Sequence, residues 1–340
     1  TGRRRCGAAA VAFLLCAVLG HTDSFAFWEP DLLYEGESIY NYLQVKETED
    51  SVILSTNVLF GVQSVKQKDG GLTGMYYDTA LAAPALADNA NSALILGMGT
   101  GTYARQLKQY YPKMNITGVE IDQKITDLAG EYFDEPADIP VTTYDGRAWL
   151  AASHDKYDVI MVDAYQDITI PFQMSSTEFF TMVREHLNPG GVMVVNMNMI
   201  SDGQGSINEA LSDTIASVFG NGNTLTADVP NTTNRELFAK KPGSGSEENS
   251  MQQASKALNL RETTYERTGS EDLEWYMEEV ASRFRKVNEP DSASTILTDD
   301  KAPVEVLGMH AIDQIIADEA GPYRQILKDE GFGGLLRAVQ

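Results

Sequence analysis

The sequence is poor in cysteine and histidine. Its 340 residues include only two cysteines, Cys6 and Cys16, which both lie in one apolar stretch near the N-terminus. No two of the four histidines stand at the spacing of metal ligands (His21, His154, His186 and His310). These residues can build neither a disulfide framework nor a zinc cluster. The composition therefore argues against a metal enzyme.

Basic residues are also scarce. The chain has 26 Lys and Arg against 49 Asp and Glu, which gives a formal net charge of −23. A surface this acidic repels phosphate backbones and attracts small cations, so nucleic acid is excluded as the expected partner. Acidic residues also serve solubility alone, so the charge does not by itself identify a substrate.

The sequence lacks a long hydrophobic run. The uncharged stretch from Cys6 to Gly20 is shorter than the roughly 20 residues that cross a bilayer comfortably. It follows Arg3-Arg4-Arg5 and precedes the aromatic segment Phe25–Trp28, so it could be a signal peptide, a single anchor or the last helix of a truncated membrane domain. The triple arginine argues against a buried soluble helix. We expect residues 1–35 to attach the protein to a membrane, on an undetermined side. The chain begins with Thr1, which leaves open that an upstream part is missing.

Residues 36–76 predict a small antiparallel β domain. Three short segments have strand-like composition, and the third is followed by the turn Asp69-Gly70-Gly71. The segments are Asn41–Val45, Ser51–Ser55 and Val62–Lys66.

Residues 77–320 predict an α/β domain, with 321–340 as a C-terminal tail. Apolar strand candidates alternate with helical patterns, which is typical of a parallel sheet covered by helices, the doubly wound Rossmann-like arrangement. The expected strands are Ala93–Leu96, Ile116–Ile121, Val141–Thr143, Tyr157–Val162 and Val192–Asn196. The expected helices are Tyr103–Tyr111, Gln123–Phe133, Ser176–Leu187 and Glu271–Arg285, with further helical cover from His310 onward. The segment Gly243–Gln253 is rich in Gly, Ser and Glu and predicts a mobile excursion.

A glycine-rich turn follows the first of these strands. Gly97, Gly99 and Gly101 allow a sharp turn and a close approach to a ligand at a helix N-terminus. The next strand ends in Val119-Glu120-Ile121-Asp122. Glu120 lies about 20 residues beyond the glycines, where an acidic side chain can bind both ribose hydroxyls. This pair predicts a nucleoside site and does not distinguish NAD from AdoMet.

Acidic residues also follow the next two strands. Asp145-Gly146 comes after the short third strand, where the aspartate can accept a hydrogen bond from an adenine amino group. Asp163 and Asp167 follow the fourth strand, at the edge where open α/β sheets build their sites. There they could hold a cationic amine or accept its proton. Capping or turn roles are the alternative for all three aspartates.

The order of these motifs resembles spermidine synthase and its relatives, whose fold is that of the class I AdoMet-dependent methyltransferases. The resemblance spans roughly residues 38 to 310. It is carried by Tyr77 with Leu81–Leu86, Gly97–Gly101, Val119–Asp122, Asp145-Gly146, Tyr157–Ile160, Asp163, Glu178–Phe180, Leu187–Gly191, Leu297–Asp300 and Pro303–Glu305. The N-terminal stretch resembles members that are fused behind membrane helices.

The resemblance implies an aminopropyl transfer. Decarboxylated AdoMet is the implied co-substrate, bound through the glycine loop, Glu120 and Asp145, and a polyamine such as putrescine is the acceptor. Asp163, Asp167 and Tyr77 are then the expected catalytic residues. A metal and a tightly bound cofactor are not required. A homodimer is expected by resemblance alone.

The chain also departs from the family pattern. Thr100 stands where synthases usually carry a loop aspartate, Asp78 and Thr79 replace a His-Glu pair, and Asp163 and Asp167 are separated by three positions instead of two. Three alternatives therefore stay open: a methyltransferase that uses intact AdoMet, a non-catalytic nucleoside-binding regulator and, less favoured, a dehydrogenase.

Overall fold

A computed structural model describes residues 11–16, 31–57, 62–164, 170–198, 205–243, 259–292 and 294–311. The chain divides into two compact units, residues 1–70 and residues 71–340. Each unit has its own sheet, which matches the predicted order of a small antiparallel sheet before a larger α/β sheet.

The first unit holds a four-stranded antiparallel sheet. Its strands are β1 (Leu32–Glu37), β2 (Tyr42–Glu47), β3 (Ser51–Thr56) and β4 (Ser64–Gln67), in the order β1-β2-β3-β4. Leu43, Val45 and Leu54 are fully buried. The spacing of two between Leu43 and Val45 places both side chains on one face. Strand β1 was not predicted. It begins inside residues 1–35, which the sequence pattern assigned to the N-terminal segment, and ends at Glu37.

Residues 11–16 form a short exposed helix in the N-terminal apolar stretch. Among the described residues there is no helix with the length and apolar character needed to span a membrane. The rest of the stretch, including Arg3-Arg4-Arg5 and Phe25–Trp28, lies outside the described residues.

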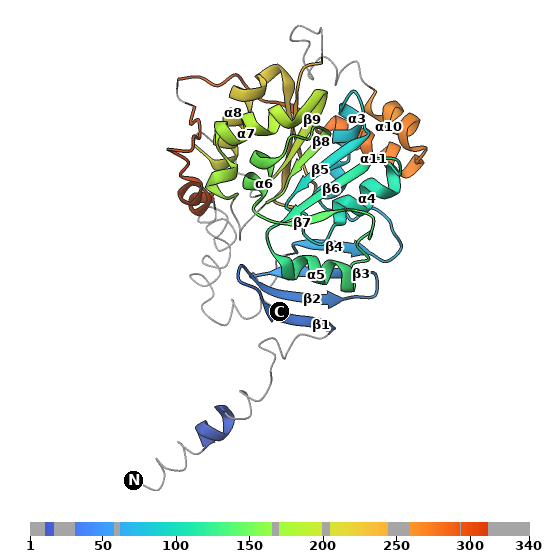
Figure 1. Ribbon diagram of the computed structural model, residues 1–340, viewed down its shortest axis with the longest axis vertical. Coiled ribbons are helices and arrows are strands. Elements are labelled where there is room, and N and C mark those ends of the chain that lie inside the picture. Colours follow the sequence, from blue (N-terminus) through green and yellow to red (C-terminus); the bar gives the residue numbers. More distant parts are fainter. Residues whose placement is uncertain are drawn as a thin grey trace, which may run out of the picture. The chain divides into compact units, whose positions relative to one another are not determined.

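The second unit is built on an eight-stranded mixed sheet (Figure 1). Five strands are parallel: β5 (Ser92–Leu96), β6 (Asn115–Glu120), β7 (Val141–Thr143), β8 (Tyr157–Val162) and β9 (Leu187–Met197). Three antiparallel strands extend the β9 side: β10 (Thr224–Asp228), β11 (Arg235–Lys240) and β12 (Arg285–Lys286). The full order is β12-β10-β11-β9-β8-β5-β6-β7.

Helices cover both faces of this sheet, so its central strands are buried and mostly apolar. Every residue of β8 is buried. One apolar cluster joins the sheet to α2 (Tyr76–Ala80), α3 (Ala82–Leu86), α4 (Thr102–Tyr110), α10 (Leu260–Thr268) and α11 (Glu271–Ser282). We call this side of the sheet the α4 face.

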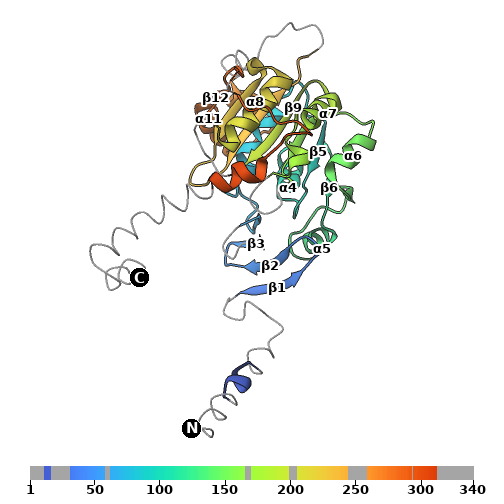
Figure 2. The ribbon, with the colours of Figure 1, turned by 90° about the vertical axis from the view of Figure 1, so that its left-hand side faces the viewer.

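The opposite side of the sheet, the α8 face, carries the second apolar cluster. Its helices are α6 (Gly146–Ala152), α7 (Thr177–His186) and α8 (Ile207–Phe219), and residues of the helix at 304–311 join them (Figure 2). Helix α5 (Gln123–Tyr132) packs against β6 and β7. Short 3-10 turns occur at Phe172–Met174 and Asn221–Asn223.

The structure refines several sequence expectations. Strand β9 begins at Leu187, directly after α7, and thus five residues before the expected start at Val192. The C-terminal helix starts at residue 304, before His310. Most of the expected excursion at Gly243–Gln253 lies outside the described residues. The alternating α/β architecture is as predicted.

Candidate active site

The glycine loop joins β5 to α4 and lies against the end of β8. Gly97 has φ +88°, and a Cβ atom on it would stand 2.3 Å from the backbone oxygen of Asp163. Gly101, with φ +77°, caps α4. Only glycine adopts these positive φ values without strain. The loop therefore needs glycine because the chain turns sharply directly beside Asp163.

Glu120, at the end of β6, reaches back to this loop. Its Oε2 accepts a 2.8 Å hydrogen bond from the Gly99 N–H, and its Oε1 accepts one of 3.0 Å from the Asp122 N–H. Glu120 is 7% exposed. Burial raises the pKa of this carboxyl, while the backbone donors act in the opposite direction. The predicted pairing of the glycine loop with Glu120 is present, and a carboxylate has lone pairs left for a ligand hydroxyl.

The N–H groups of the loop are largely used within the protein. Gly97 and Met98 donate to the Val119 carbonyl, Gly99 donates to Glu120, and Gly101 donates to the Met98 carbonyl. These four groups therefore do not point into a ligand site as free donors. The glycines contribute through backbone shape, and Glu120 is the polar group that a nucleoside would meet first.

Asp145 and Gly146 lie next to the same loop. The backbone N–H of Tyr144 bonds to the Glu120 carbonyl, and a Cβ on Gly146 would come within 3.7 Å of Leu96, the residue before Gly97. Asp145 caps α6, because its Oδ1 accepts a 2.8 Å hydrogen bond from Ala148 N–H. The aspartate thus occupies the predicted edge of the sheet in a capping role.

Asp163 directly follows β8 at the same edge of the sheet. Its Oδ2 accepts a 2.6 Å hydrogen bond from the Tyr76 hydroxyl, and its Oδ1 accepts one of 2.9 Å from Asn196. Part of the residue is accessible, yet the carboxyl group is surrounded by protein. This desolvation raises the pKa of Asp163 to about 7, although the bonds from Tyr76 and Asn196 lower it and the charge of Glu120 raises it further. A carboxyl with this pKa can accept a proton near neutral pH.

The Asn196 amide is itself held in place. Its Oδ1 accepts a 2.9 Å hydrogen bond from the Asn234 side chain, so its Nδ2 is directed at Asp163. Asn196 lies at the end of β9, and Asn234 directly precedes β11. Two strands of the sheet therefore orient one carboxylate.

The other predicted catalytic residues have different outcomes. The hydroxyl that bonds Asp163 belongs to Tyr76, a residue that the sequence did not indicate. Its neighbour Tyr77 stays a predicted catalytic residue. The two rings lie 4.0 Å apart between centroids, and both side chains are buried. Asp167 lies outside the described residues. Tyr76, Asn196 and Asn234 were not identified from the sequence, because no local motif marks them.

The positions that depart from the family pattern are buried. Asp78 has a structural role, since its carboxylate accepts bonds from Thr73, Gly74 and Gln106. Thr79 bonds to the Tyr276 hydroxyl at 3.0 Å. Thr100 is fully buried, and its hydroxyl has no hydrogen-bond partner. The loop position that holds a charge in the related synthases is thus neutral and unpartnered here.

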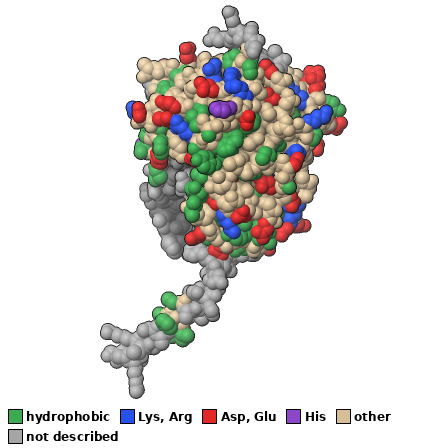
Figure 3. Space-filling view, viewed as in Figure 1, with side chains coloured by type: hydrophobic (Ala, Val, Ile, Leu, Met, Phe, Trp, Pro, Cys, Tyr) green, Lys and Arg blue, Asp and Glu red, His purple; other side chains and the backbone are tan. Residues whose placement is uncertain are grey.

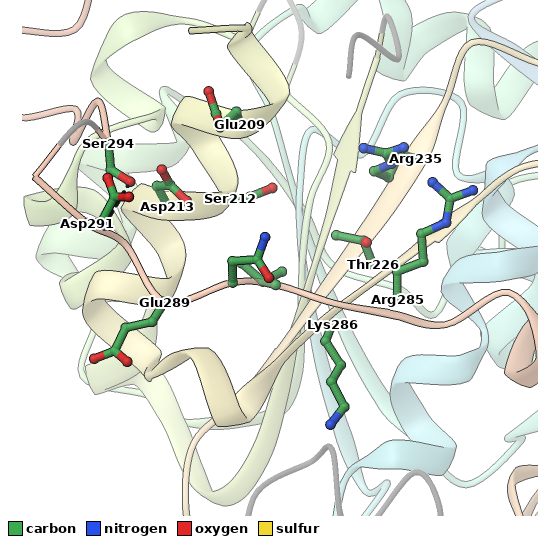
Figure 4. A pocket seen from close by; sticks show the side chains of 12 residues that line it. Glu209, Ser212, Asp213, Thr226, Arg235, Arg285, Lys286, Glu289, Asp291 and Ser294 are labelled. Atoms are coloured by element: carbon green, nitrogen blue, oxygen red, sulfur yellow. Dashed lines mark hydrogen bonds between the residues drawn. The ribbon is translucent and has the colours of Figure 1, made fainter. Parts of the chain in front are cut away.

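A separate cavity of about 440 Å³ lies on the α8 face. In Figure 4, the guanidinium groups of Arg235 and Arg285 stand on one side of it, and Glu209 and Asp213 on the other. Arg235 and Arg285 both pair with Asp228. Val159 and Met161 of β8 belong to the apolar cluster of the α4 face. Side chains alternate along a strand, so Asp163 lies on the α4 face as well. The cavity, on the opposite face, is therefore separate from the Asp163 site.

On the side of the molecule shown in Figure 3, the acidic residues do not gather into a single patch. On the surface in Figure 3, acidic and basic side chains are interspersed. Within the described residues, no group of three or more His, Cys, Asp or Glu side chains could hold a metal ion.

Comparisons with known proteins point to one family. Residues 76–241 match the spermine/spermidine synthase domain. A probable polyamine aminopropyl transferase of Bifidobacterium longum is 92% identical over 338 residues, covering 99% of this chain and 76% of that protein. A polyamine aminopropyltransferase of Vibrio vulnificus is 29% identical over 217 residues, covering 61% of this chain and 70% of that protein.

Solved structures support the fold. Spermidine synthase from Thermotoga maritima aligns with a TM-score of 0.55 at 18% identity, covering 76% of this chain and 85% of that one. A spermidine synthase in complex with the transition state analogue AdoDATO aligns with a TM-score of 0.54 at 17% identity, with the same coverage. With the 92% identical relative, these findings show that the chain belongs to the spermine/spermidine synthase family.

Proposed function

We propose that this protein is a polyamine aminopropyltransferase that uses decarboxylated AdoMet as the donor. The observation that carries the proposal is the carboxylate of Asp163, which is held by two hydrogen bonds directly beside the glycine loop. The 92% identical relative bears the name of this activity. A nucleoside with a sulfonium group would thus meet a proton acceptor at the strand end next to its binding loop.

The chemistry follows from the two halves of the site. Glu120 and the loop would hold the ribose, and Asp145 the base. Asp163 would take a proton from the acceptor ammonium. The lone pair of the free amine would then attack the methylene carbon of the aminopropyl chain that is bonded to the sulfonium sulfur. The carbon–sulfur bond breaks, its electron pair stays on sulfur, and methylthioadenosine leaves beside a secondary ammonium product.

The rate would come mostly from positioning and electrostatics. The sulfonium is already a good leaving group, so the protein must place the amine in line and stabilise its loss of a proton. The pKa of about 7 for Asp163 suits this task near neutral pH.

A methyltransferase that uses intact AdoMet is the second candidate. Thr100 favours it, because a neutral residue at this loop position would not repel the carboxylate of AdoMet as an aspartate would. The aminopropyl transfer remains the first candidate because it agrees with the family and with the role of Asp163.

One incubation distinguishes these candidates. The protein is mixed with decarboxylated AdoMet or AdoMet and with putrescine, spermidine or cadaverine. Methylthioadenosine together with an extended polyamine supports the proposed function, whereas adenosylhomocysteine supports the methyltransferase. Nucleoside binding without either product would make the protein a regulator and overturn the proposal.

We also propose that residues 1–35 attach the protein to a membrane, as in the membrane-fused branch of the family, and that the catalytic unit forms a homodimer. The first proposal is supported by the apolar run after Arg3-Arg4-Arg5. The second is supported by family resemblance alone. Flotation with lipid vesicles, with and without residues 1–30, tests the first proposal, and analytical ultracentrifugation tests the second.

A further inference from the structure

Glu236 is a fully buried carboxylate that has no hydrogen-bond partner. Its exposure is 0%, and neither of its two side-chain oxygens finds a donor among the residues that the structure describes. Burying a carboxyl group in this way costs free energy. Buried polar groups in native proteins are nearly always satisfied, so an exception such as this one indicates a ligand or a catalytic task.

The sheet register places Glu236 on the same side as Asp163. Glu236 on β11 pairs with Asn196 on β9, and the Asn196 side chain bonds to Asp163. Residues directly opposite each other on neighbouring strands share a face. Arg235, one position earlier, points to the α8 face and lines the cavity of Figure 4. Glu236 therefore faces the helices of the α4 face, as Asp163 does.

The strand order indicates whether Glu236 lies near the nucleoside or near the acceptor amine. The nucleoside residues lie on the loops after β5, β6 and β7, and Asp163 follows β8. Glu236 lies on β11, two strands from β8 in the opposite direction. With neighbouring strands about 4.8 Å apart, this offset is about 10 Å. The nucleoside thus occupies one side of Asp163, and Glu236 occupies the other.

We propose that Glu236 binds the non-reacting ammonium group of the acceptor diamine while Asp163 receives the reacting amine. This inference rests on the proposed function and assigns its acceptor site. A separation of about 10 Å between the two carboxylates matches the span of a short diamine with one nitrogen at each end. Glu236 also supplies a negative charge to a site in which Thr100 is neutral.

The protonation of the empty site agrees with this assignment. Burial and the nearby charge of Asp163 raise the pKa of Glu236 well above its ordinary range, so the group holds a proton when no cation is present. An entering ammonium would take the place of that proton. Diamine binding should then release a proton from the protein.

The experiment compares Glu236→Gln with wild type, using putrescine and n-butylamine as probes. The two amines share a four-carbon chain, and only putrescine has a second ammonium group. We expect Glu236→Gln to raise the Kd and KM for putrescine about 10- to 100-fold, as for loss of a hydrogen bond to a charged group. The values for n-butylamine should stay within about twofold. Glu266→Gln, an exposed glutamate on α10, is the matched control.

Calorimetry supplies a second readout. Putrescine binding is titrated in two buffers with different ionisation enthalpies, which reports the number of protons released. Wild type should release more protons than Glu236→Gln. The Kd for methylthioadenosine, measured on the same variant, should not change, which separates a local effect from misfolding.

The outcomes separate this inference from the proposed function. If wild type turns over but Glu236→Gln leaves the putrescine Kd and KM unchanged, Glu236 has no acceptor role and the inference fails alone. A raised KM for decarboxylated AdoMet with an unchanged KM for putrescine would also overturn it. If wild type forms no product with any amine, the proposed function fails, and the calorimetric Kd for putrescine still decides the role of Glu236.

Discussion

The Tyr76 hydroxyl donates a 2.6 Å hydrogen bond to Oδ2 of Asp163, a residue 87 positions further along the chain. This bond stabilises the ionised carboxylate and lowers its pKa, against the larger opposite effect of burial. The proton affinity of Asp163 is therefore set by a balance between α2 and the sheet. Removing the Tyr76 hydroxyl would change this balance.

Removing the Tyr76 hydroxyl should move the pH dependence of turnover. In Tyr76→Phe, Asp163 loses a donor to its charged form, so its pKa rises above about 7. The base form is populated only above this pKa, so the acid limb of kcat/KM shifts to higher pH. The profile is measured between pH 5 and 10 beside Tyr265→Phe, an exposed tyrosine. An unshifted limb would remove Tyr76 from the control of Asp163.

Neutralising Asp163 should abolish catalysis without loss of nucleoside binding. Asp163→Asn keeps the shape of the side chain but cannot accept the amine proton, and general bases contribute about 10²- to 10⁴-fold. We expect kcat to fall by at least about 100-fold, while the Kd for methylthioadenosine stays within about threefold. Product formation is followed by chromatography, and retained full activity would exclude Asp163 from the mechanism.

Nucleoside affinity should depend on Glu120 instead. Glu120→Gln replaces one acceptor oxygen with an amide group, which cannot accept from both Gly99 and Asp122. It also weakens any bond to a ribose hydroxyl. We expect the Kd for methylthioadenosine to rise about 10-fold or more. Glu131→Gln, exposed on α5, is the control, and equal affinities of the two variants would contradict the ribose role.

The part of the candidate site that is expected to bind the nucleoside, around the glycine loop and Glu120, could largely be predicted from the sequence, because its signals are local. A strand, a glycine turn and an acidic residue about 20 positions later place Gly97 and Glu120 together in any parallel sheet of this kind. Asp163 was predictable for the same reason, since it follows an apolar strand. The bond from Tyr76 to Asp163 was not predictable, because the rotation of the five-residue helix α2 decides which side chains face the carboxylate.

The acceptor half has no local signal. Asn196 and Glu236 come together only because β11 inserts antiparallel between β9 and β10, a pairing between segments 40 positions apart (236 − 196). The sequence around Glu236, Arg235–Lys240, does not mark that residue as buried.

The buried carboxylates should make stability fall with rising pH. Their pKa values lie above those of the unfolded chain, where Asp and Glu titrate at about 4. The folded protein therefore holds protons that the unfolded chain has released, and stability decreases from about pH 4 towards and through pH 7. In Asp163→Asn and Glu236→Gln this loss is removed. We expect both variants to exceed wild type in Tm, more at pH 8 than at pH 5. An equal difference at both pH values would mean that these carboxyl groups bind no more protons in the folded protein than in the unfolded chain over this range.

A methyl group on Gly97 should disturb the site through the backbone. In Gly97→Ala the new Cβ would stand 2.3 Å from the Asp163 carbonyl oxygen, closer than any stable contact, and the φ of +88° is unfavourable for alanine. The strand end that carries Asp163 must then move, and an unfavourable φ alone costs about 1–3 kcal/mol. We expect a lower Tm, and in the protein that remains folded a fall in kcat larger than the change in nucleoside Kd. Gly130→Ala, on α5 with open space around it, should stabilise or leave Tm unchanged. If Gly97→Ala matched that control in both Tm and kcat, the close approach between the glycine loop and Asp163 would have no part in positioning the base.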